Sequence, residues 1–236
     1  MTSSARTRAF DDLAVARGYQ EWYAGPGRYA DYVERALLET MLAGLGGITT
    51  VLEVGCGTGH FTRWFADIGF QVTGVELSAA MLAEARRSGS PLCIQADAQS
   101  LPFAAGAFDL VAMITSLEFV ADPDQAVQEA VRVADKALLL GVLNRCSLLA
   151  VWQHGLGHKL LPAARFFAPW ELEAMVRRVA AQRLRSLRWR TTLWPLPGVW
   201  HSALPWGGFI GLCAEFTTRD SAPQRAAGFS PRGLLP

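Results

Sequence analysis

Three glycines at alternate positions, Gly55, Gly57 and Gly59, form the pattern in this sequence with the clearest chemical meaning. They follow a β-branched, apolar run at 49–54 and precede a helical pattern that begins at His60. Glycines between a strand and a helix let the backbone approach a bound nucleotide where a Cβ would clash. A dinucleotide fingerprint needs Gly or Ala at the sixth position, where this chain has His60, and no GxxxxGK[ST] loop occurs. The loop therefore predicts a nucleotide-like ligand other than NAD, FAD or a P-loop triphosphate.

Two carboxylates occupy positions at which they could bind the rest of such a ligand. Glu76 ends the run at 71–76, 21 residues beyond Gly55, where a carboxylate can accept both hydroxyls of a ribose. The alternative is a solvated carboxylate at the end of a strand. Asp97 follows the run at 92–95, and with the amide of Ala98 it could contact the edge of an adenine. Together with the glycine loop, these residues favour a ligand that contains a nucleoside.

Strand and helix patterns alternate around these residues. Short β-branched or apolar runs predict strands at 49–54, 71–76, 92–95, 108–114, 137–143, 184–192 and 209–217. Apolar residues at helical spacing predict helices at 29–45, 60–67, 78–87, 123–134 and 169–181. This alternation is typical of an α/β fold with a parallel sheet and right-handed crossovers.

The stretches VLEVGCGTG, GVELS and ADAQSLPF, followed by FDLV, carry a resemblance to a known family. In order and spacing the chain resembles the class I S-adenosylmethionine-dependent methyltransferases across 49–143, most closely the ubiquinone and menaquinone biosynthesis branch. The resemblance implies a Rossmann-like, mostly parallel sheet of seven strands with an antiparallel last strand and helices on both faces. It also implies S-adenosyl-L-methionine as cofactor and direct in-line methyl transfer as the reaction.

The resemblance further implies a set of cofactor-binding residues. In the family the glycine loop holds the methionine end of the cofactor, and an N-terminal helix folds over it. The matching positions are Tyr19 and Tyr23 of that helix; Glu53, Gly55, Cys56, Gly57 and Gly59 of the glycine loop; Glu76 for the ribose; Leu77, Met81, Asp97 and Ala98 for the adenine; and Thr115 near the sulfonium.

The residues that could bind the methyl acceptor are less clearly indicated by the sequence. The segments 144–167 and 193–208 are long connections rich in aromatic residues, and we expect them to form a small helical cap over the carboxyl edge of the sheet. Their aromatics could line an acceptor pocket or simply fill the core of the cap. Glu118, His154 and His158 are candidate acceptor contacts, although each has a plain structural interpretation as well. No metal site is predicted, because the histidine pair lacks a third ligand.

Composition favours one domain over residues 1–236, with an N-terminal helical segment at 1–45, a cofactor-binding core at 49–143 and a disordered tail at 221–236. Apolar residues make up 51% of the chain and charged residues 18%, which supplies a sizeable core. No stretch approaches the roughly 18–20 apolar residues of a membrane span. The four scattered cysteines form no CxxC pair and the N-terminus resembles no signal peptide, so we expect a cytoplasmic protein. The oligomeric state is not fixed by the sequence.

We expect the partner to be a small, apolar or aromatic acceptor, but charge leaves another function open. Residues 151–236 carry 11 basic and 4 acidic side chains, and six arginines fall within 177–190. These arginines are either a solvated face or an anion-facing surface that would suit a nucleic-acid methyltransferase. Against the latter, no (N/D)PP(Y/F) tetrad follows 108–114. A catalytically silent S-adenosylmethionine-binding protein is the second alternative.

Overall fold

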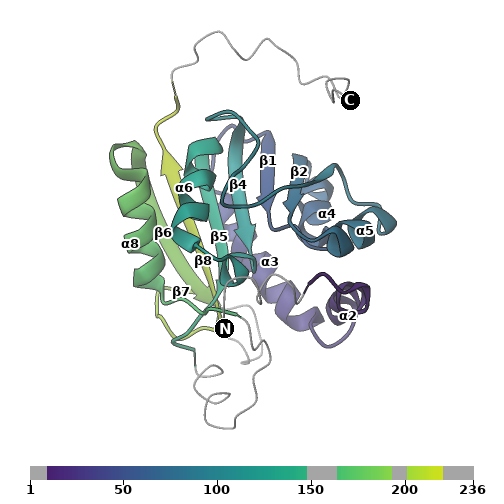
Figure 1. Ribbon diagram of the computed structural model, residues 1–236. Coiled ribbons are helices and arrows are strands. Elements are labelled where there is room, and N and C mark those ends of the chain that lie inside the picture. Colours follow the sequence, from purple (N-terminus) through teal and green to yellow (C-terminus); the bar gives the residue numbers. More distant parts are fainter. Residues whose placement is uncertain (1–9, 148–163, 193–200, 220–236) are drawn as a thin grey trace.

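The computed structural model describes residues 10–147, 164–192 and 201–219 (Figure 1). Within these ranges eight strands form one sheet in the order β3-β2-β1-β4-β5-β8-β6-β7. The strands are β1 (Thr50–Val54), β2 (Gln71–Glu76), β3 (Cys93–Gln95), β4 (Phe108–Ile114), β5 (Ala134–Leu143), β6 (Leu184–Thr192), β7 (His201–Ser202) and β8 (Phe209–Phe216). The helices are α2 (Leu13–Ala24), α3 (Arg28–Leu42), α4 (His60–Asp67), α5 (Ala79–Arg87), α6 (Pro123–Val133) and α8 (Pro169–Ala180), with short 3-10 turns η1 (Leu117–Phe119) and η2 (Ala181–Arg183).

The predicted α/β fold with a mostly parallel sheet is confirmed. The five strands from β3 to β5 pair in parallel, and β8 inserts antiparallel between β5 and β6. The predicted count of seven strands is wrong, because β7 adds an eighth by pairing with Thr191 and Thr192 of β6. A strand of two residues has no periodicity that a sequence pattern could reveal.

Helices cover both faces of the sheet, as predicted (Figure 1). On one face, Leu37 of α3 and Phe65 of α4 pack in the same apolar cluster as Leu139 of β5. On the other, α6 and α8 pack in a cluster that contains the neighbouring strand residue, Leu138. Successive side chains of a strand point to opposite faces, so β5 contributes to both clusters at once and its apolar run is continuous.

Capping residues fix where the helices begin beside the carboxyl edge of the sheet. The Ser78 hydroxyl accepts the N–H of Met81 at 3.2 Å and so caps the N-terminus of α5. The Asp12 carboxylate accepts the N–H of Ala14 at 2.7 Å and begins α2. That helix packs against α5 and α3, so it carries its aromatic residues to the end of the sheet where β1 and β2 stop.

Candidate functional site

A pocket lies at the carboxyl edge of the sheet, beyond β1, β2, β3 and β4. Open α/β sheets bind their ligands at this edge. Of the predicted cofactor-binding residues, all but Gly59 line the pocket: Tyr19, Tyr23, Glu53, Gly55, Cys56, Gly57, Glu76, Leu77, Met81, Asp97, Ala98 and Thr115. The fold therefore brings together residues that lie up to 96 positions apart in the chain.

The glycine loop after β1 has a backbone conformation that only glycine adopts readily. Gly55 has a φ of +77° and Gly57 a φ of +53°. A Cβ at Gly55 would lie 2.4 Å from the Cβ of Ser116, whereas a Cβ at Gly57 would meet no atom within 4 Å. Gly55 is thus required by packing, and Gly57 opens onto the free space of the pocket, as a backbone cradle for a ligand requires.

Gly59 serves a different purpose from the other two glycines. It begins α4 with a φ of +75°, and a Cβ there would lie 1.8 Å from the Oγ of Ser90. The Arg63 guanidinium bridges the same place, donating to the Thr58 carbonyl and to Ser90 Oγ. Close packing against Ser90 therefore accounts for this glycine, and its predicted contact with the cofactor stays a prediction.

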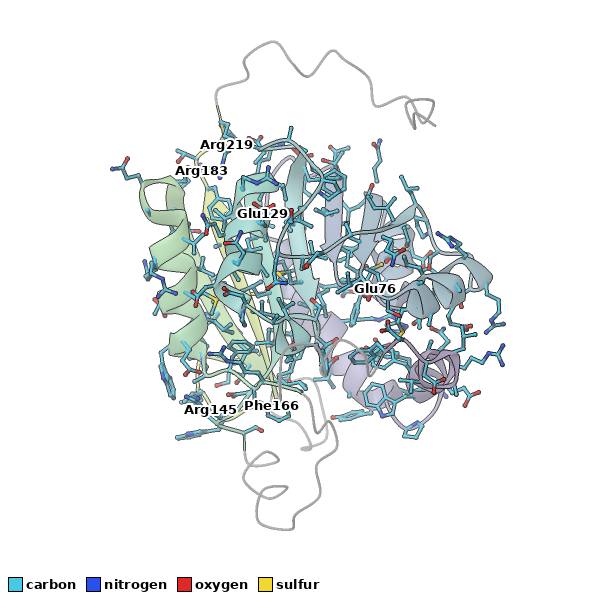
Figure 2. The ribbon with its side chains drawn as sticks, viewed as in Figure 1. Glu76, Glu129, Arg145, Phe166, Arg183 and Arg219 are labelled. Carbon is cyan, nitrogen blue, oxygen red and sulfur yellow. The ribbon has the colours of Figure 1, made fainter. Side chains whose placement is uncertain are left out.

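Glu76, labelled in Figure 2, is the last residue of β2 and lines the pocket. Its Oε2 accepts the N–H of Gly57 at 3.0 Å, and its Oε1 accepts the N–H of Ser78 at 2.8 Å. Burial raises the pKa of this carboxyl, and the backbone donors Ser78 and Gly57 oppose the rise. A carboxylate offers about four lone-pair positions, so each oxygen keeps one for a ligand hydroxyl. The geometry suits a pair of neighbouring hydroxyls such as those of a ribose.

Glu53 and Cys56 form the floor beneath the loop. Glu53 is 1% exposed, and its Oε2 accepts the hydroxyl of Thr62 at 2.5 Å. Burial raises the pKa of Glu53 to about 8, so this carboxyl is mostly neutral at pH 7 and can donate as well as accept a hydrogen bond. Cys56 is buried and its thiol pKa is raised, first by a hydrogen bond with Cys93, which fits a small packing side chain better than a nucleophile.

The wall beyond β2 and β3 combines apolar and polar groups. Leu77 and the buried Met81 both supply apolar surface to the pocket. The Asp97 Oδ1 accepts the backbone N–H of Gln99 at 2.8 Å, which holds the loop after β3 in place. An aromatic base between the two apolar side chains, with Asp97 at its edge, fits this arrangement.

The opposite wall is aromatic and hydroxylated. The hydroxyls of Tyr19 and Tyr23 lie 3.4 Å apart, and the Tyr23 ring stacks on His60 with centroids separated by 3.7 Å. Thr115, just past β4, has a φ of +46° although it is not a glycine. A non-glycine residue in this region stores backbone strain that is typical of functional sites.

Sequence analysis missed Phe10 and Phe119, which both line the pocket with ring centroids 4.9 Å apart. Phe119 follows the strand predicted at 108–114, and its place at the carboxyl edge could have revealed it. Phe10 belongs to a polar N-terminal stretch with no periodicity, so no signal marked it. His60, in the first turn of α4, stacks on Tyr23 and lines the pocket as well.

Comparison with known proteins shows what the residues of this site resemble. Residues 52–137, which include the glycine loop, Glu76, Asp97 and Thr115, match the methyltransferase domain model. These residues are therefore similar to a methyltransferase domain. A crystal structure of an S-adenosylmethionine-dependent methyltransferase from Thermotoga maritima, described as a possible histamine N-methyltransferase, is 26% identical with a TM-score of 0.70, covering 86% of this chain and 96% of its own. The predicted resemblance to S-adenosylmethionine-dependent methyltransferases is thereby confirmed.

Curated relatives of the methyltransferase domain are named for different acceptors. A malonyl-[acyl-carrier protein] O-methyltransferase of Enterobacter lignolyticus is 42% identical over 84 residues, which is 35% of this chain and 34% of that protein. A ubiquinone biosynthesis O-methyltransferase of Xanthomonas oryzae pv. oryzae is 33% identical over 148 residues, 56% of this chain and 62% of that protein. The chain thus spans about one third to three fifths of the length of these relatives.

The candidate acceptor residues are placed only in part. Glu118 lies on η1 and is 0% exposed, and its Oε1 accepts the N–H of Leu143 at 2.7 Å. It does not line the pocket itself, although its neighbours Ser116 and Phe119 do. His154 and His158 lie outside the described residues. The predicted tail at 221–236 and most of the two predicted cap segments lie outside them as well.

The ends of the two predicted cap segments meet at the carboxyl end of β5. The Asn144 Nδ2 donates to the carbonyls of Pro205 and Gly207 at 2.6 and 2.7 Å. The backbone N–H of Arg145 donates to the Phe167 carbonyl at 2.9 Å. In Figure 2, Arg145 and Phe166 lie at the end of the molecule opposite Arg183 and Arg219. Both segments therefore leave the sheet at the edge that holds the pocket.

The arginines at 177–190 mostly have partners within the protein. Arg177 pairs with Glu173 and Arg188 with Glu215, each at 2.8 Å, and Arg178 pairs with Asp124. Arg183 donates to the carbonyls of Val131, Ala134 and Asp135. Four of the six arginines thus serve local structure, which weakens the anion-facing interpretation. Across 10–147, 164–192 and 201–219, no helix is long and apolar enough to cross a bilayer, and no three His, Cys, Asp or Glu side chains gather as a metal site.

Proposed function

We propose that this methyltransferase domain binds S-adenosylmethionine in the pocket at the carboxyl edge and transfers its methyl group to a small acceptor. The observation that carries the proposal is the pairing of Glu76 with Gly57. The Gly57 N–H holds one oxygen of the carboxylate, and the same glycine leaves open space beside it. A carboxylate that can accept a pair of hydroxyls lies next to a backbone that leaves space for a ligand. This combination fits a nucleoside better than a bare phosphate.

The other pocket residues fit the rest of this cofactor. Glu53 accepts or donates a hydrogen bond at the amino-acid end, because its raised pKa keeps it close to neutral until a cation binds. Leu77 and Met81 flank the adenine, and Asp97 accepts from its amino group. Tyr19 and Tyr23 present aromatic faces, which attract cations by about 0.5–2 kcal/mol.

S-adenosylmethionine supplies an activated methyl group on a sulfonium, which an acceptor nucleophile takes by in-line displacement. The chain therefore has mainly to orient the acceptor and exclude water. Orientation of this kind supplies up to about 7–11 kcal/mol of rate acceleration. The described ends of the segments 144–167 and 193–208 are joined at Asn144, at the carboxyl end of β5, and in this proposal the two segments form the acceptor cap.

The acceptor is a small molecule in this proposal. The relatives are named for different acceptors, so the acceptor itself is not inherited from them. The internal pairing of the arginines at 177–190 disfavours a nucleic acid. A cytoplasmic location stays a prediction.

Equilibrium binding and turnover together test the proposal. In calorimetric titration of the full chain, S-adenosylmethionine and S-adenosylhomocysteine should each bind at one site, and NAD should not bind. Release of S-adenosylhomocysteine on adding a methyl acceptor separates the enzyme from a catalytically silent binding protein. Binding of NAD in place of S-adenosylhomocysteine would overturn the assignment of the pocket.

A further inference from the structure

Two cysteines from different elements meet beside a glycine of β2. Gly74 is paired with Cys93 of β3 in the parallel register, and its N–H donates to the Leu92 carbonyl at 2.8 Å. The order of the sheet places β1 on the other side of β2, and there the backbone N–H of Cys56 donates to the Val75 carbonyl at 2.9 Å. The glycine loop and β3 therefore approach the same part of β2 from its two sides.

Gly74 leaves the space that the two cysteine side chains fill. A Cβ at this position would lie 2.8 Å from the Sγ of Cys56, 2.9 Å from the Sγ of Cys93 and 3.0 Å from the Cβ of Cys56. The two sulfurs therefore cannot be farther apart than the sum of the first two distances. Glycine inside a strand is typical of a place where other groups approach the backbone closely. Here those groups are two free thiols.

The two thiols differ in their surroundings. Cys56 is buried and lines the cofactor pocket, whereas Cys93 is half-buried and lies outside the pocket lining. A hydrogen bond with Cys56 lowers the pKa of Cys93, and the Arg63 guanidinium lowers it further, while the same hydrogen bond raises the pKa of Cys56. Partly exposed thiols with thiolate character beside a cation are the ones that react with oxidants. Cys93 is therefore the sulfur that reacts first.

We propose that Cys56 and Cys93 form a reversible disulfide on exposure to a peroxide, and that this bond lowers the affinity of the pocket for its cofactor. The proposal rests on the proposed function for its consequence, because it names a regulation of the same pocket. A disulfide holds its sulfurs about 2.0 Å apart and its Cβ atoms about 3.5–4.5 Å apart. Formation of the bond therefore draws the glycine loop and β3 together, and it displaces the Gly57 N–H from its hydrogen bond with Glu76.

The reaction balances with hydrogen peroxide as the oxidant. The Cys93 thiolate attacks one peroxide oxygen, the O–O bond breaks, and Cys93 becomes a sulfenic acid while the released hydroxide takes up a proton to form water. The Cys56 sulfur then attacks the sulfenic sulfur, and the displaced hydroxyl leaves as water with the proton of the Cys56 thiol. Two thiols and one peroxide thus give one disulfide and two waters. Small thiols reverse the bond by exchange, as is typical of regulatory disulfides in a reducing compartment.

The bound cofactor and the disulfide should oppose each other. Cys56 lines the pocket between Gly55 and Gly57, so a ligand held by the glycine loop fixes the backbone that has to move. If the disulfide weakens S-adenosylhomocysteine binding by a given factor, bound S-adenosylhomocysteine must disfavour the disulfide by the same factor. The ligand should therefore protect both thiols from peroxide.

Peptide mapping of the full chain tests the bond itself. The reduced chain is treated with hydrogen peroxide, alkylated and digested without a reductant. A cross-linked peptide pair that joins Cys56 to Cys93 should appear, while Cys146 and Cys213 are recovered as alkylated thiols. Saturating S-adenosylhomocysteine should slow the formation of the cross-link. Cysteines 56 and 93 that stay free, or that are oxidised separately without a cross-link, would overturn the proposal.

Calorimetric titration tests the consequence of the bond. Oxidation should lower S-adenosylhomocysteine affinity about tenfold or more, because the hydrogen bond that holds Glu76 is disturbed, and dithiothreitol should restore it. Cys93→Ser removes a sulfur outside the pocket lining, so it should bind as the reduced wild type does and keep its affinity after peroxide.

Cys146→Ser is the matched control, because Cys146 is also half-buried and outside the pocket lining, and it should respond to peroxide as wild type does. A cross-linked chain with undiminished affinity would contradict the proposal. A loss of affinity in peroxide-treated Cys93→Ser would contradict it as well, since another residue would then be the target. If Cys93→Ser fails to fold, the peptide map and the reversal by dithiothreitol in the wild type still decide.

Failure of the proposed function would have a different signature. A reduced wild-type chain that binds no S-adenosylhomocysteine contradicts the proposed function, whatever the peptide map shows. A chain that binds S-adenosylhomocysteine when reduced but forms no cross-link keeps its function and loses only this regulation.

Discussion

Two acidic residues at the carboxyl edge of the sheet, Glu76 in the pocket and Glu118 beside it, are held in opposite ways. On the cofactor half, Glu76 is held by two backbone N–H donors, and its remaining lone pairs face the free space beside Gly57. Outside the pocket lining, Glu118 is held by the N–H of Leu143, and its buried Oε2 has no hydrogen-bond partner among the residues that the structure describes. The first carboxylate is preorganised for neutral hydroxyls, whereas burial raises the pKa of Glu118 to about 7 and favours its neutral form. The difference teaches that burial alone does not make a carboxyl a ligand group, because only Glu76 both lines the pocket and has free lone pairs there.

The largest expected effect tests the cofactor half. Gly57→Val places a branched side chain at a φ of +53°, in the space reserved for the ligand. We expect S-adenosylhomocysteine affinity to fall by about 100-fold or more, because both the cradle and the N–H contact to Glu76 are disturbed. Circular dichroism should show a folded protein, since no protein atom lies within 4 Å of the new Cβ. A folded variant with normal affinity would mean that the glycine loop is not the binding site.

The residues of the cofactor half of the pocket could be predicted from the sequence more easily than those of the acceptor half. Gly55, Gly57, Glu76 and Asp97 each follow the end of a strand, and parallel strands end at one edge, so a local motif was enough to place them. Glu34 and Phe10 carried no such signal, because a lone acidic residue in an amphipathic helix reads as solvated and Phe10 stands in a polar stretch. Glu118 was a candidate, but its burial depends on the backbone of Leu143, 25 residues away. Tertiary contacts between distant segments are what a single sequence does not display.

The pH dependence of the free energy of unfolding should reveal the two buried carboxyls, Glu34 and Glu118. The pKa of Glu34 is raised to about 8 and that of Glu118 to about 7, from an ordinary value of 4.5. Between pH 4.5 and these values the folded chain keeps protons that the unfolded chain has released, so the free energy of unfolding falls as pH rises. Urea denaturation from pH 5 to 8 should show this fall, and Glu34→Gln or Glu118→Gln should flatten it. A slope unchanged from wild type in both variants would show that these carboxyls titrate normally.

A smaller effect concerns the hydrogen bonds that join the ends of the two predicted cap segments. Asn144→Ala removes the donors to the carbonyls of Pro205 and Gly207 and leaves both without this partner. We expect a loss of about 1–3 kcal/mol in the free energy of unfolding, measured by chemical denaturation. S-adenosylhomocysteine affinity should stay the same, because Asn144 does not line the pocket. A loss of affinity as large as the loss of stability would show that the two halves are not independent.

Glu76→Ala provides the most direct test of the central claim, that the carboxyl edge of the sheet is a nucleoside site. Calorimetric titration with S-adenosylhomocysteine compares it with wild type and with Glu173→Ala, a control on α8 whose partners Arg177 and Trp189 lie outside the pocket. Hydrogen bonds to a charged group contribute about 1.5–3 kcal/mol, so affinity should fall about tenfold or more in Glu76→Ala and remain at the wild-type value in the control. An affinity in Glu76→Ala equal to that of wild type would contradict the account.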